Sequence, residues 1–464
     1  MATLGATACA ALVACSLSTQ PPSVRDWLVF GSDVAHSSAP ATAGLTRSSV
    51  ASLHLQQVML DGTVDGSAVY VHGASVEGSL HNAFFVTTTY GKTIAIDADD
   101  GAVLWEYTPA SYASLAGTYQ ITNATPVVDG NRAFLYAASP DGVIRKLSIS
   151  DGSVIWATAI TLLPAREKIA SPLTFFGGKV IAATNGYAGD TPPYQGHVAI
   201  LDAATGSLQA VWNSLCSNQS GLLNPAACAQ SDSGIWGRAG VAVDSSTGDL
   251  FVATGNGLWD GAANWGDSVI ELSPDATQVV GNYTPADYAQ LDQNDLDLGS
   301  TSPVLLGNNR VAQGGKDGII RVIDWSAMRG ATSHVGGEAS TVPTPSGADL
   351  FTAPAVLSRS GATWLFAADG GGTSAWTLVS TSLQLQWHVA RAGTSPVVTD
   401  GLLIVYDPNG ALCIYDSMTG SLITSWPCGA GHWNSPIAVD GRIALPEGNA
   451  NSHLTTGILD IWRE

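Results

Sequence analysis

The chain is poor in charged residues, and especially in basic ones. Of its 464 residues only 12% are charged, with 18 Lys and Arg against 38 Asp and Glu, so the formal net charge is −20. This balance argues against a nucleic-acid-binding protein, because Lys and Arg must neutralise phosphates. The hydrophobic fraction of 45% excludes a disordered chain, which would be too polar to form a core. No apolar run of about 18 residues follows the extreme N-terminus, so we expect no transmembrane span.

Helical periodicity is almost absent from the sequence. The 51 Gly, 22 Pro and 14 Trp instead favour many short strands joined by tight turns. Length alone suggests about three domains of ~150 residues each, but one large all-β domain can reach the same size. The composition therefore predicts an all-β protein.

Cysteine is also scarce. Residues 1–15 are small and apolar, and they resemble the apolar region of a signal peptide that ends in a lipobox at Cys15. We therefore expect an exported protein (in the periplasm, on the cell surface or outside the cell), a linker at 16–24 and possible lipidation of Cys15. An even number of cysteines remains, which suggests disulfides in an exported chain. We expect the bridges Cys216–Cys228 and Cys413–Cys428. No Cys-x-x-Cys-His is present, so no covalent c-type haem is expected.

A pattern of about 40–50 residues recurs along the chain. Each unit begins with a small residue, usually followed by Pro, and contains apolar runs separated by Gly turns. The six clearest starts are Thr125-Pro126, Ser171-Pro172, Ser302-Pro303, Ala353-Pro354, Ser395-Pro396 and Ser435-Pro436. Ser67 and Gly240 open two further units without the Pro, which makes eight units.

The end of a unit is marked by Asp, then Gly, then Trp, as in Asp97, Gly101 and Trp105. Four short strands in a unit of this length are typical of a propeller blade. We therefore predict a single eight-bladed β-propeller of four-stranded antiparallel blades over residues 25–464. Residues 53–58 have no hairpin partner of their own. We expect them to pair with the last strand, near 458–462, so that the ring has no open edge.

The blade signature resembles the PQQ-type repeat of quinoprotein β-propellers, and this resemblance covers residues 25–464. The opening segment from Trp27 to His36 looks like the pre-blade segment of polyvinyl-alcohol-dehydrogenase-like members. The family includes dehydrogenases that use pyrroloquinoline quinone (PQQ) with Ca²⁺ or a lanthanide. It also includes non-catalytic members such as the outer-membrane assembly lipoprotein. The resemblance thus specifies the fold more closely than the function.

Four residues match positions that carry the chemistry in family dehydrogenases. Asp295 and Asp297 are two residues apart, so they lie on one side of an extended segment. The resemblance implies that Asp295 is the catalytic base beside the metal, and that Asp297 is an extra ligand associated with lanthanide use. It also implies that Asn256, in Thr-Gly-Asn, is a metal ligand and that Lys316 contacts the quinone oxygens. Carboxylate and amide oxygens suit a hard cation.

The sequence departs from the family pattern at several points. The loop that should supply a Glu ligand offers only Asp190, and no vicinal cysteine pair is present to stack on the quinone. For the other stacking wall Trp236 lies close to the expected position, but Arg238 is the nearer match. Turns also use Asp and Asn for purely structural reasons, so each match has a structural alternative. Further polar or aromatic candidates on the same face are Glu167, Lys168, Asp369, Asp407, His432, Trp433, Asn434 and Glu447.

These observations leave three functions open. The first is a PQQ- and metal-dependent dehydrogenase that acts on a small or polymeric alcohol or on a sugar hydroxyl. The second is a non-catalytic scaffold that docks a protein partner at the cell envelope, and the third is a glycan-binding propeller. No His-Glu-x-x-His, Gly-x-Ser-x-Gly or phosphate-binding loop points to another class of enzyme.

Overall fold

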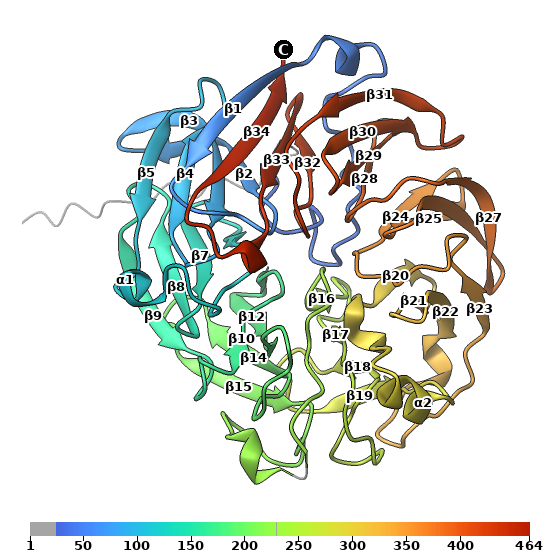
Figure 1. Ribbon diagram of the computed structural model, residues 1–464. Helices are drawn as coiled ribbons and strands as arrows, with labels where there is room; N and C mark the ends of the chain where they lie inside the picture. The colour runs from blue at the N-terminus through green and yellow to red at the C-terminus, as the bar shows by residue number, and fades with distance from the viewer. Residues whose placement is uncertain (1–24, 229) are drawn as a thin grey trace, which may run out of the picture.

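Eight four-stranded antiparallel sheets surround a central axis (Figure 1). The computed structural model describes residues 25–228 and 230–464. The predicted eight-bladed propeller is therefore confirmed. The expected leader, the linker and Cys15 lie outside the described residues.

The strands of each blade follow one another in sequence from the innermost to the outermost. The first blade contains β2 (Val69–Val76), β3 (Ser79–Thr87), β4 (Thr93–Asp97) and β5 (Val103–Tyr107). The second contains β6 (Val127–Val128), β7 (Phe134–Ser139), β8 (Val143–Ser148) and β9 (Val154–Ala159). The third contains β11 (Thr174–Phe176), β12 (Lys179–Ala183), β14 (His197–Asp202) and β15 (Leu208–Asn213). The fourth contains β16 (Ala242–Val243), β17 (Leu250–Ala253), β18 (Val269–Leu272) and β19 (Val279–Tyr283).

The remaining blades follow the same order. The fifth contains β20 (Val304–Gly307), β21 (Arg310–Gln313), β22 (Ile319–Asp324) and β23 (Ser340–Pro343). The sixth contains β24 (Ala355–Arg359), β25 (Ala362–Ala368), β26 (Thr373–Val379) and β27 (Ser382–Val389). The seventh contains β28 (Val397–Thr399), β29 (Leu402–Asp407), β30 (Ala411–Asp416) and β31 (Leu422–Pro427). The eighth contains β32 (Ile437–Val439), β33 (Arg442–Glu447), β34 (Gly457–Arg463) and, as its outer strand, β1 (His54–Leu60).

The ring closes by pairing the two ends of the propeller. Strand β1 is antiparallel to β34, with Val58 opposite Leu459, as Figure 1 shows for the blue and red strands. The side-chain amide of Gln57 also donates a 3.0 Å hydrogen bond to Asp460. The predicted closure is confirmed, and it supplies the eighth blade with its fourth strand, so that β34 is not left as an open edge.

The Gly and Trp of the repeat are explained by contacts between neighbouring blades. The indole of Trp105, in blade 1, lies against Gly152, in blade 2, where an added Cβ would come within 2.6 Å of the ring. Gly152 has a φ of +70°, so the turn and the close approach both favour glycine. Trp156 meets Gly206 in the same way one blade further on. The Nε1–H of Trp105 donates to the carbonyl of Ile149 at 2.8 Å, which satisfies its one donor.

The segment before the first blade crosses the inner strands of the ring. Its backbone makes hydrogen bonds of 2.7–2.9 Å to six blades, through Tyr70, Val128, Val243, Val356, Val398 and Gly441. His36 Nε2 lies 3.2 Å from the hydroxyl of Thr174 in a seventh blade. One short segment therefore ties together blades that are far apart in the sequence.

Helices are few and short. The α-helices are α1 (Tyr112–Leu115) and α2 (Tyr288–Gln293), and the 3₁₀ turns are η1 (Ser49–Ser52), η2 (Pro225–Ala227), η3 (Leu298–Ser300), η4 (Trp325–Ala327) and η5 (Ala450–Ser452). A small ribbon of β10 (Glu167–Lys168) and β13 (Asn185–Gly186) stands outside the blades. Within the described ranges, none of the helices has the length and apolar character that crossing a bilayer requires.

One predicted disulfide forms and the other does not. Cys216 and Cys228 are bonded, as expected. Cys413 and Cys428 are free, so the prediction of a bridge between them is wrong. The hairpin places Cys413 opposite Ser425, whereas the backbone of Cys428 pairs with Gly410, three residues further along. The register therefore separates the two thiols along the hairpin.

Candidate functional site

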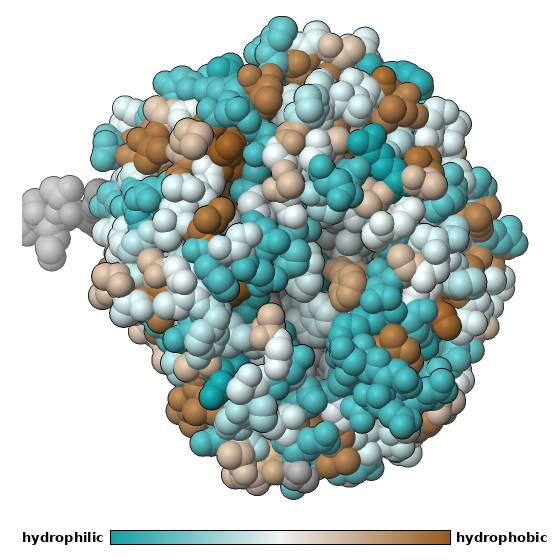
Figure 2. Space-filling view, viewed as in Figure 1, coloured by the Kyte–Doolittle hydropathy of each residue, from teal (hydrophilic) through white to brown (hydrophobic). Residues whose placement is uncertain are grey.

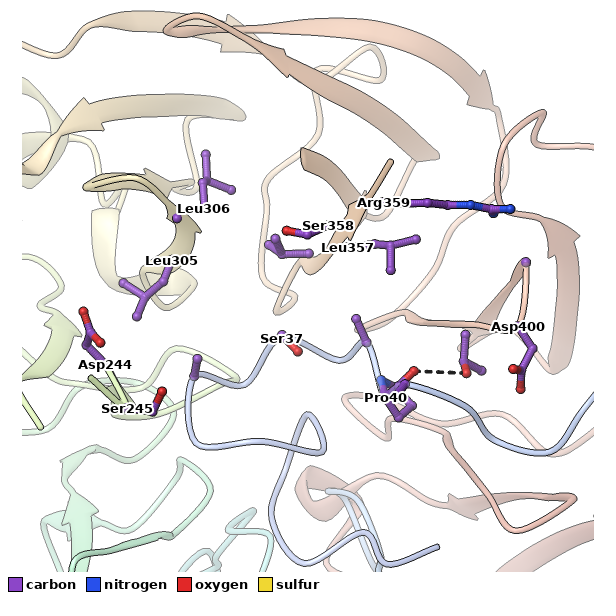
Figure 3. A pocket seen from close by; sticks show the side chains of 17 residues that line it. Ser37, Pro40, Asp244, Ser245, Leu305, Leu306, Leu357, Ser358, Arg359 and Asp400 are labelled. Carbon is purple, nitrogen blue, oxygen red and sulfur yellow. Dashed lines mark hydrogen bonds between the residues drawn. The ribbon is translucent and has the colours of Figure 1, made fainter. Parts of the chain in front are cut away.

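Two cavities of very different chemistry lie at the two ends of the inner strands. The wider one, of about 800 Å³, opens where residues 35–41 pass the turns after β16, β20, β24 and β28. Figure 3 shows Ser37 and Pro40 of that segment facing Leu305 and Leu357. None of the residues that the sequence predicts for the site lines it. Volume therefore does not identify the functional end of the ring.

The other cavity contains the predicted chemistry. It has a volume of about 360 Å³ and is lined by the loops before the first strand and after the second strand of several blades. The same face carries η5 and α2, and Figure 2 shows it hollowed near the ring axis. We call it the main cavity. Six of the seven predicted site residues line it: Asp190, Trp236, Asn256, Asp295, Asp297 and Lys316.

A lysine between two carboxylates forms the centre of the main cavity. Lys316 Nζ lies 2.7 Å from Asp295 Oδ1 and also forms an ion pair with Asp297. The side chain of Asp295 is 74% exposed, whereas that of Asp297 is only 10% exposed. Burial would lower the pKa of Lys316, but the two carboxylates raise it above its usual value. The ammonium therefore stays charged and links the two acids.

Asn256 joins this centre from the neighbouring blade. Its backbone N–H donates a 2.7 Å hydrogen bond to Asp297, and its side-chain Nδ2 donates to Asp295 at 3.0 Å. Its Oδ1 is buried and has no hydrogen-bond partner within residues 25–228 and 230–464. A buried amide oxygen without a partner is costly unless a ligand engages it, so this atom is a suitable donor for a cation.

A second pair of acids lies on the wall formed by blades 3 and 4. Tyr194 donates hydrogen bonds from its hydroxyl to Asp190, at 3.2 Å, and to Asp232. Burial, together with the charge of the neighbouring acids, raises the pKa of Asp232 to about 6 and that of Asp190 above its usual value. The acids of this wall thus repel one another, and a bound cation would relieve that repulsion. Even so, no three His, Cys, Asp or Glu side chains converge as a ready metal site anywhere in the described ranges.

Three aromatic rings also line the main cavity. Trp236 stacks on Trp433 with ring centroids 5.6 Å apart and planes inclined by 14°, and Phe351 packs against both. Lys316 Nζ lies 5.5 Å from the centroid of the Trp236 ring. Flat aromatic faces beside a cation suit a planar ligand that carries oxygen atoms.

Arg238 is the one predicted site residue that the fold does not bring to the main cavity. It is 1% exposed and its guanidinium lies 4.9 Å from the ring centroid of Trp433. It lines instead a smaller cavity of about 140 Å³, which shares Phe351, His432 and Trp433 with the main cavity. Trp236, two residues earlier, is the one of the two that lines the main cavity.

Lys168, on β10, is a cation of the main cavity without a partner. No hydrogen bond or ion pair holds its ammonium within the described part of the chain. Burial lowers its pKa to about 8, although the charge of Asp65 opposes this. An unpaired ammonium on the wall of a cavity is suited to an anionic group of a ligand.

Sequence reasoning missed Tyr194, Asp232, Phe351 and Asp65 as residues of this region. Asp232 follows a loop closed by the predicted Cys216–Cys228 bridge, which was a usable signal. No signal in the sequence pointed to Asp65, because its partner His432 is 367 residues away.

Of the other predicted candidates, Asp369 lines the small cavity, Asp407 pairs with Arg391 at 2.9 Å and Glu447 accepts a hydrogen bond from the backbone of Gly429.

Comparisons with known proteins agree with this architecture. A family model described as the outer membrane protein assembly factor BamB matches residues 58–222. Quinohemoprotein alcohol dehydrogenase ADH IIB of Pseudomonas putida is 27% identical over 292 residues, which cover 56% of this chain and 40% of that protein. The match thus spans less than half the length of this relative.

Solved structures share the fold at low sequence identity. Quinohemoprotein alcohol dehydrogenase ADHIIG of Pseudomonas putida HK5 has a TM-score of 0.73 and 16% identity, covering 95% of this chain and 80% of that one. A europium-containing methanol dehydrogenase has a TM-score of 0.70 and 15% identity, covering 95% of this chain and 98% of that one. BamB of Moraxella catarrhalis has a TM-score of 0.52 and 13% identity, covering 88% of this chain and 98% of that one.

Proposed function

We propose, from the premise that this chain is a β-propeller of the PQQ-like repeat family, that it binds PQQ and a hard cation and oxidises an alcohol or sugar hydroxyl. The observation that carries the proposal is the convergence of six predicted residues, from blades 3, 4 and 5, on one cavity. Neither their spacing in the sequence nor ordinary turn chemistry requires them to meet there.

The main cavity suits a planar quinone. Trp236 and Trp433 offer aromatic surface, and Lys316 offers a charged donor for quinone oxygens. Lys168 supplies a second, unpaired ammonium for an anionic group of the ligand. The volume of about 360 Å³ lies within the range of small-molecule sites, roughly 300–1,000 Å³.

The donors for the cation are oxygen atoms, as Ca²⁺ and lanthanides require. Asn256 would bind through its free Oδ1, and Asp297, Asp295 and Asp190 would supply carboxylates. When bound, the cation and the quinone supply Lewis acidity and the acceptor of a hydride. The residues of the chain hold these groups, and Lys316 orients Asp295 and Asp297 towards them. The role of Asp295 as a base stays a prediction.

We also propose that the protein works outside the cytoplasm. The Cys216–Cys228 disulfide supports this, since disulfides persist in oxidising compartments.

A scaffold that docks an envelope protein is the second candidate, and the match of residues 58–222 to the BamB family model favours it. A docking role does not account for the acids, lysine and aromatic rings of the main cavity.

Equilibrium dialysis with PQQ and either Ca²⁺ or La³⁺, followed by dye reduction with a panel of alcohols and sugars, tests the proposal. We expect one PQQ per chain with at least one of the cations, and reduction of the dye with at least one substrate. Trp236→Ala should lower the bound fraction, whereas Trp364→Ala, on β25 away from the main cavity, should not. Absence of binding with both cations would reject the enzyme and leave the scaffold.

A further inference from the structure

An aspartate and a histidine from opposite ends of the chain meet beside the main cavity. Nδ1 of His432, in the loop before β32, lies 2.8 Å from Oδ2 of Asp65, in the loop before β2. The side chain of Asp65 is fully buried, and that of His432 is 25% exposed. Asp65 is therefore shielded from solvent, whereas His432 remains accessible to a ligand.

Four donors hold Asp65 in place. Besides His432, its carboxylate accepts from Asn123 Nδ2 at 2.9 Å and from the backbone N–H groups of Trp433 and Ala450, at 2.9 and 3.0 Å. Burial would raise the pKa of Asp65, but the hydrogen bonds from His432 and from the backbone of Ala450, with the charge of Arg238, hold it below its usual value. The carboxylate is thus ionised and fixed in position.

This arrangement selects one tautomer of His432. An ionised carboxylate at Nδ1 requires the proton on that nitrogen, so the neutral ring of His432 carries its lone pair on Nε2. Within the described part of the chain Nε2 has no hydrogen-bond partner. His432 lines both the main cavity and the small cavity, and its ring stacks on Trp433 at 4.7 Å. His432 therefore contributes to the walls of both cavities.

We propose that His432, oriented by Asp65, accepts the proton of the substrate hydroxyl, with the carbon chain of the substrate in the small cavity. This inference rests on the proposed dehydrogenase function. Asp295, the alternative acceptor, is already held by Lys316 and Asn256. His432 is the catalytic residue of the pair, and Asp65 is a positioning residue.

The step balances as a two-electron oxidation of the substrate. The hydroxyl O–H bond breaks and its proton goes to Nε2 of His432, while the C–H bond breaks and its hydrogen leaves with the electron pair as hydride. The C–O bond becomes a carbonyl. That hydride would pass to the two-electron acceptor that the proposed function supplies, and His432 would then release its proton to solvent.

Other charges surround the pair and belong in any account of its pH dependence. On the inner side they are Arg238 and Lys168, and on the side of the small cavity they are Asp349 and Asp369. A change in activity with pH is therefore assigned to His432 only if it disappears in a His432 variant.

The test uses His432→Ala in the full chain loaded with PQQ and cation. We expect PQQ still to bind, a loss of dye reduction of about 100-fold or more, loss of the fall in rate on acidification, and partial recovery with added imidazole. His81→Ala is the matched control, since His81 forms a similar 2.7 Å pair with Asp97 away from the cavities. An unchanged rate with PQQ bound would overturn the role of His432 alone. Failure of the wild-type protein to bind PQQ would overturn the proposed function, and this role with it.

A second measurement needs neither PQQ nor substrate. Nitrogen-15 NMR of the histidine rings should find His432 as the Nδ1–H tautomer in the wild-type protein and a mixture of tautomers in Asp65→Asn. The Nε2–H tautomer in the wild-type protein would overturn the proposal, because Nε2 would then have no lone pair for the proton. If Asp65→Asn does not fold, the wild-type spectrum still decides.

Discussion

The backbone N–H of Asn256 donates a 2.7 Å hydrogen bond to Oδ1 of Asp297, joining the loop after β17 to the loop before β20. This bond brings the side chains of two blades to one point of the main cavity. The Oδ1 of Asn256 has no hydrogen-bond partner among the residues that the structure describes.

Gly255 makes this contact possible, because a Cβ there would lie 2.3 Å from Asp297 Oδ1 and 3.2 Å from Trp236 Nε1. We expect Gly255→Ala to displace Asp297 and to weaken PQQ binding about 10-fold or more, a loss of roughly 1.4 kcal/mol. Quenching of tryptophan fluorescence measures the dissociation constant. Gly130→Ala, where a Cβ would meet nothing within 4 Å, is the control. Equal affinities of the two variants would contradict this account of the loop contact.

Lys316 neutralises part of the acidic charge of the main cavity. Lys316→Met should therefore tighten the binding of a lanthanide, since a cation would meet the two carboxylates without competition. The same change should weaken PQQ binding. Terbium luminescence, sensitised by nearby tryptophan, measures the first effect. Lys179→Met removes a half-buried lysine that lies outside the main cavity and donates a 2.7 Å hydrogen bond to the carbonyl of Pro274, so it should change neither affinity. Weaker terbium binding by Lys316→Met would be the contrary result.

Glu167 predicts a pH dependence of stability. Burial raises its pKa from an ordinary value of 4.5 to about 7, despite hydrogen bonds from Thr161 and the backbone of Gln195. Below pH 4.5 the carboxyl is protonated in both states. As pH rises towards 7, the unfolded chain releases the proton first, so the free energy of unfolding falls, by up to about 3 kcal/mol.

Glu167→Gln cannot ionise and should lack this loss. Urea unfolding at about pH 5 and about pH 8 measures the free energy of unfolding of the variant and of the wild type. The variant should gain stability relative to the wild type at the higher pH. A difference that does not change with pH would mean that Glu167 ionises normally in the folded protein.

The Cys216–Cys228 disulfide closes a loop of 12 residues, so the chain-entropy model gives it about 3 kcal/mol of stability. Reduction should lower the unfolding temperature of the wild-type protein and leave that of Cys216→Ser/Cys228→Ser unchanged. Because Cys413 is free, Cys413→Ser should respond to reduction as the wild type does. Loss of that response in Cys413→Ser would place the bridge elsewhere.

The fold could be predicted because its signals are local. The Gly turns and the Trp recur in several blades, and the contact of Trp105 with Gly152 is repeated by Trp156 with Gly206 and by Trp387 with Gly420. The pairing of β1 with β34 followed from a strand without a partner. The Cys413–Cys428 bridge was predicted from proximity in sequence, which does not report the register of the hairpin.

The site could be predicted only in part, because it is assembled from several blades. Asp295, Asp297 and Asn256 lie in short motifs with readable spacing, and the fold brings them together. Asp65 and His432 are joined only by closure of the ring, so neither residue identifies the other in the sequence. Arg238 and Trp236 are two residues apart, and only the direction of each side chain decides which one lines the main cavity.

The most direct test of the central claim is a titration of the purified protein with PQQ in the presence of Ca²⁺ or La³⁺, followed by isothermal calorimetry. The account predicts saturable binding of one PQQ per chain that depends on the cation and is weakened in Asp297→Ala. Absence of saturable binding with either cation, or binding that Asp297→Ala leaves unchanged, would contradict it.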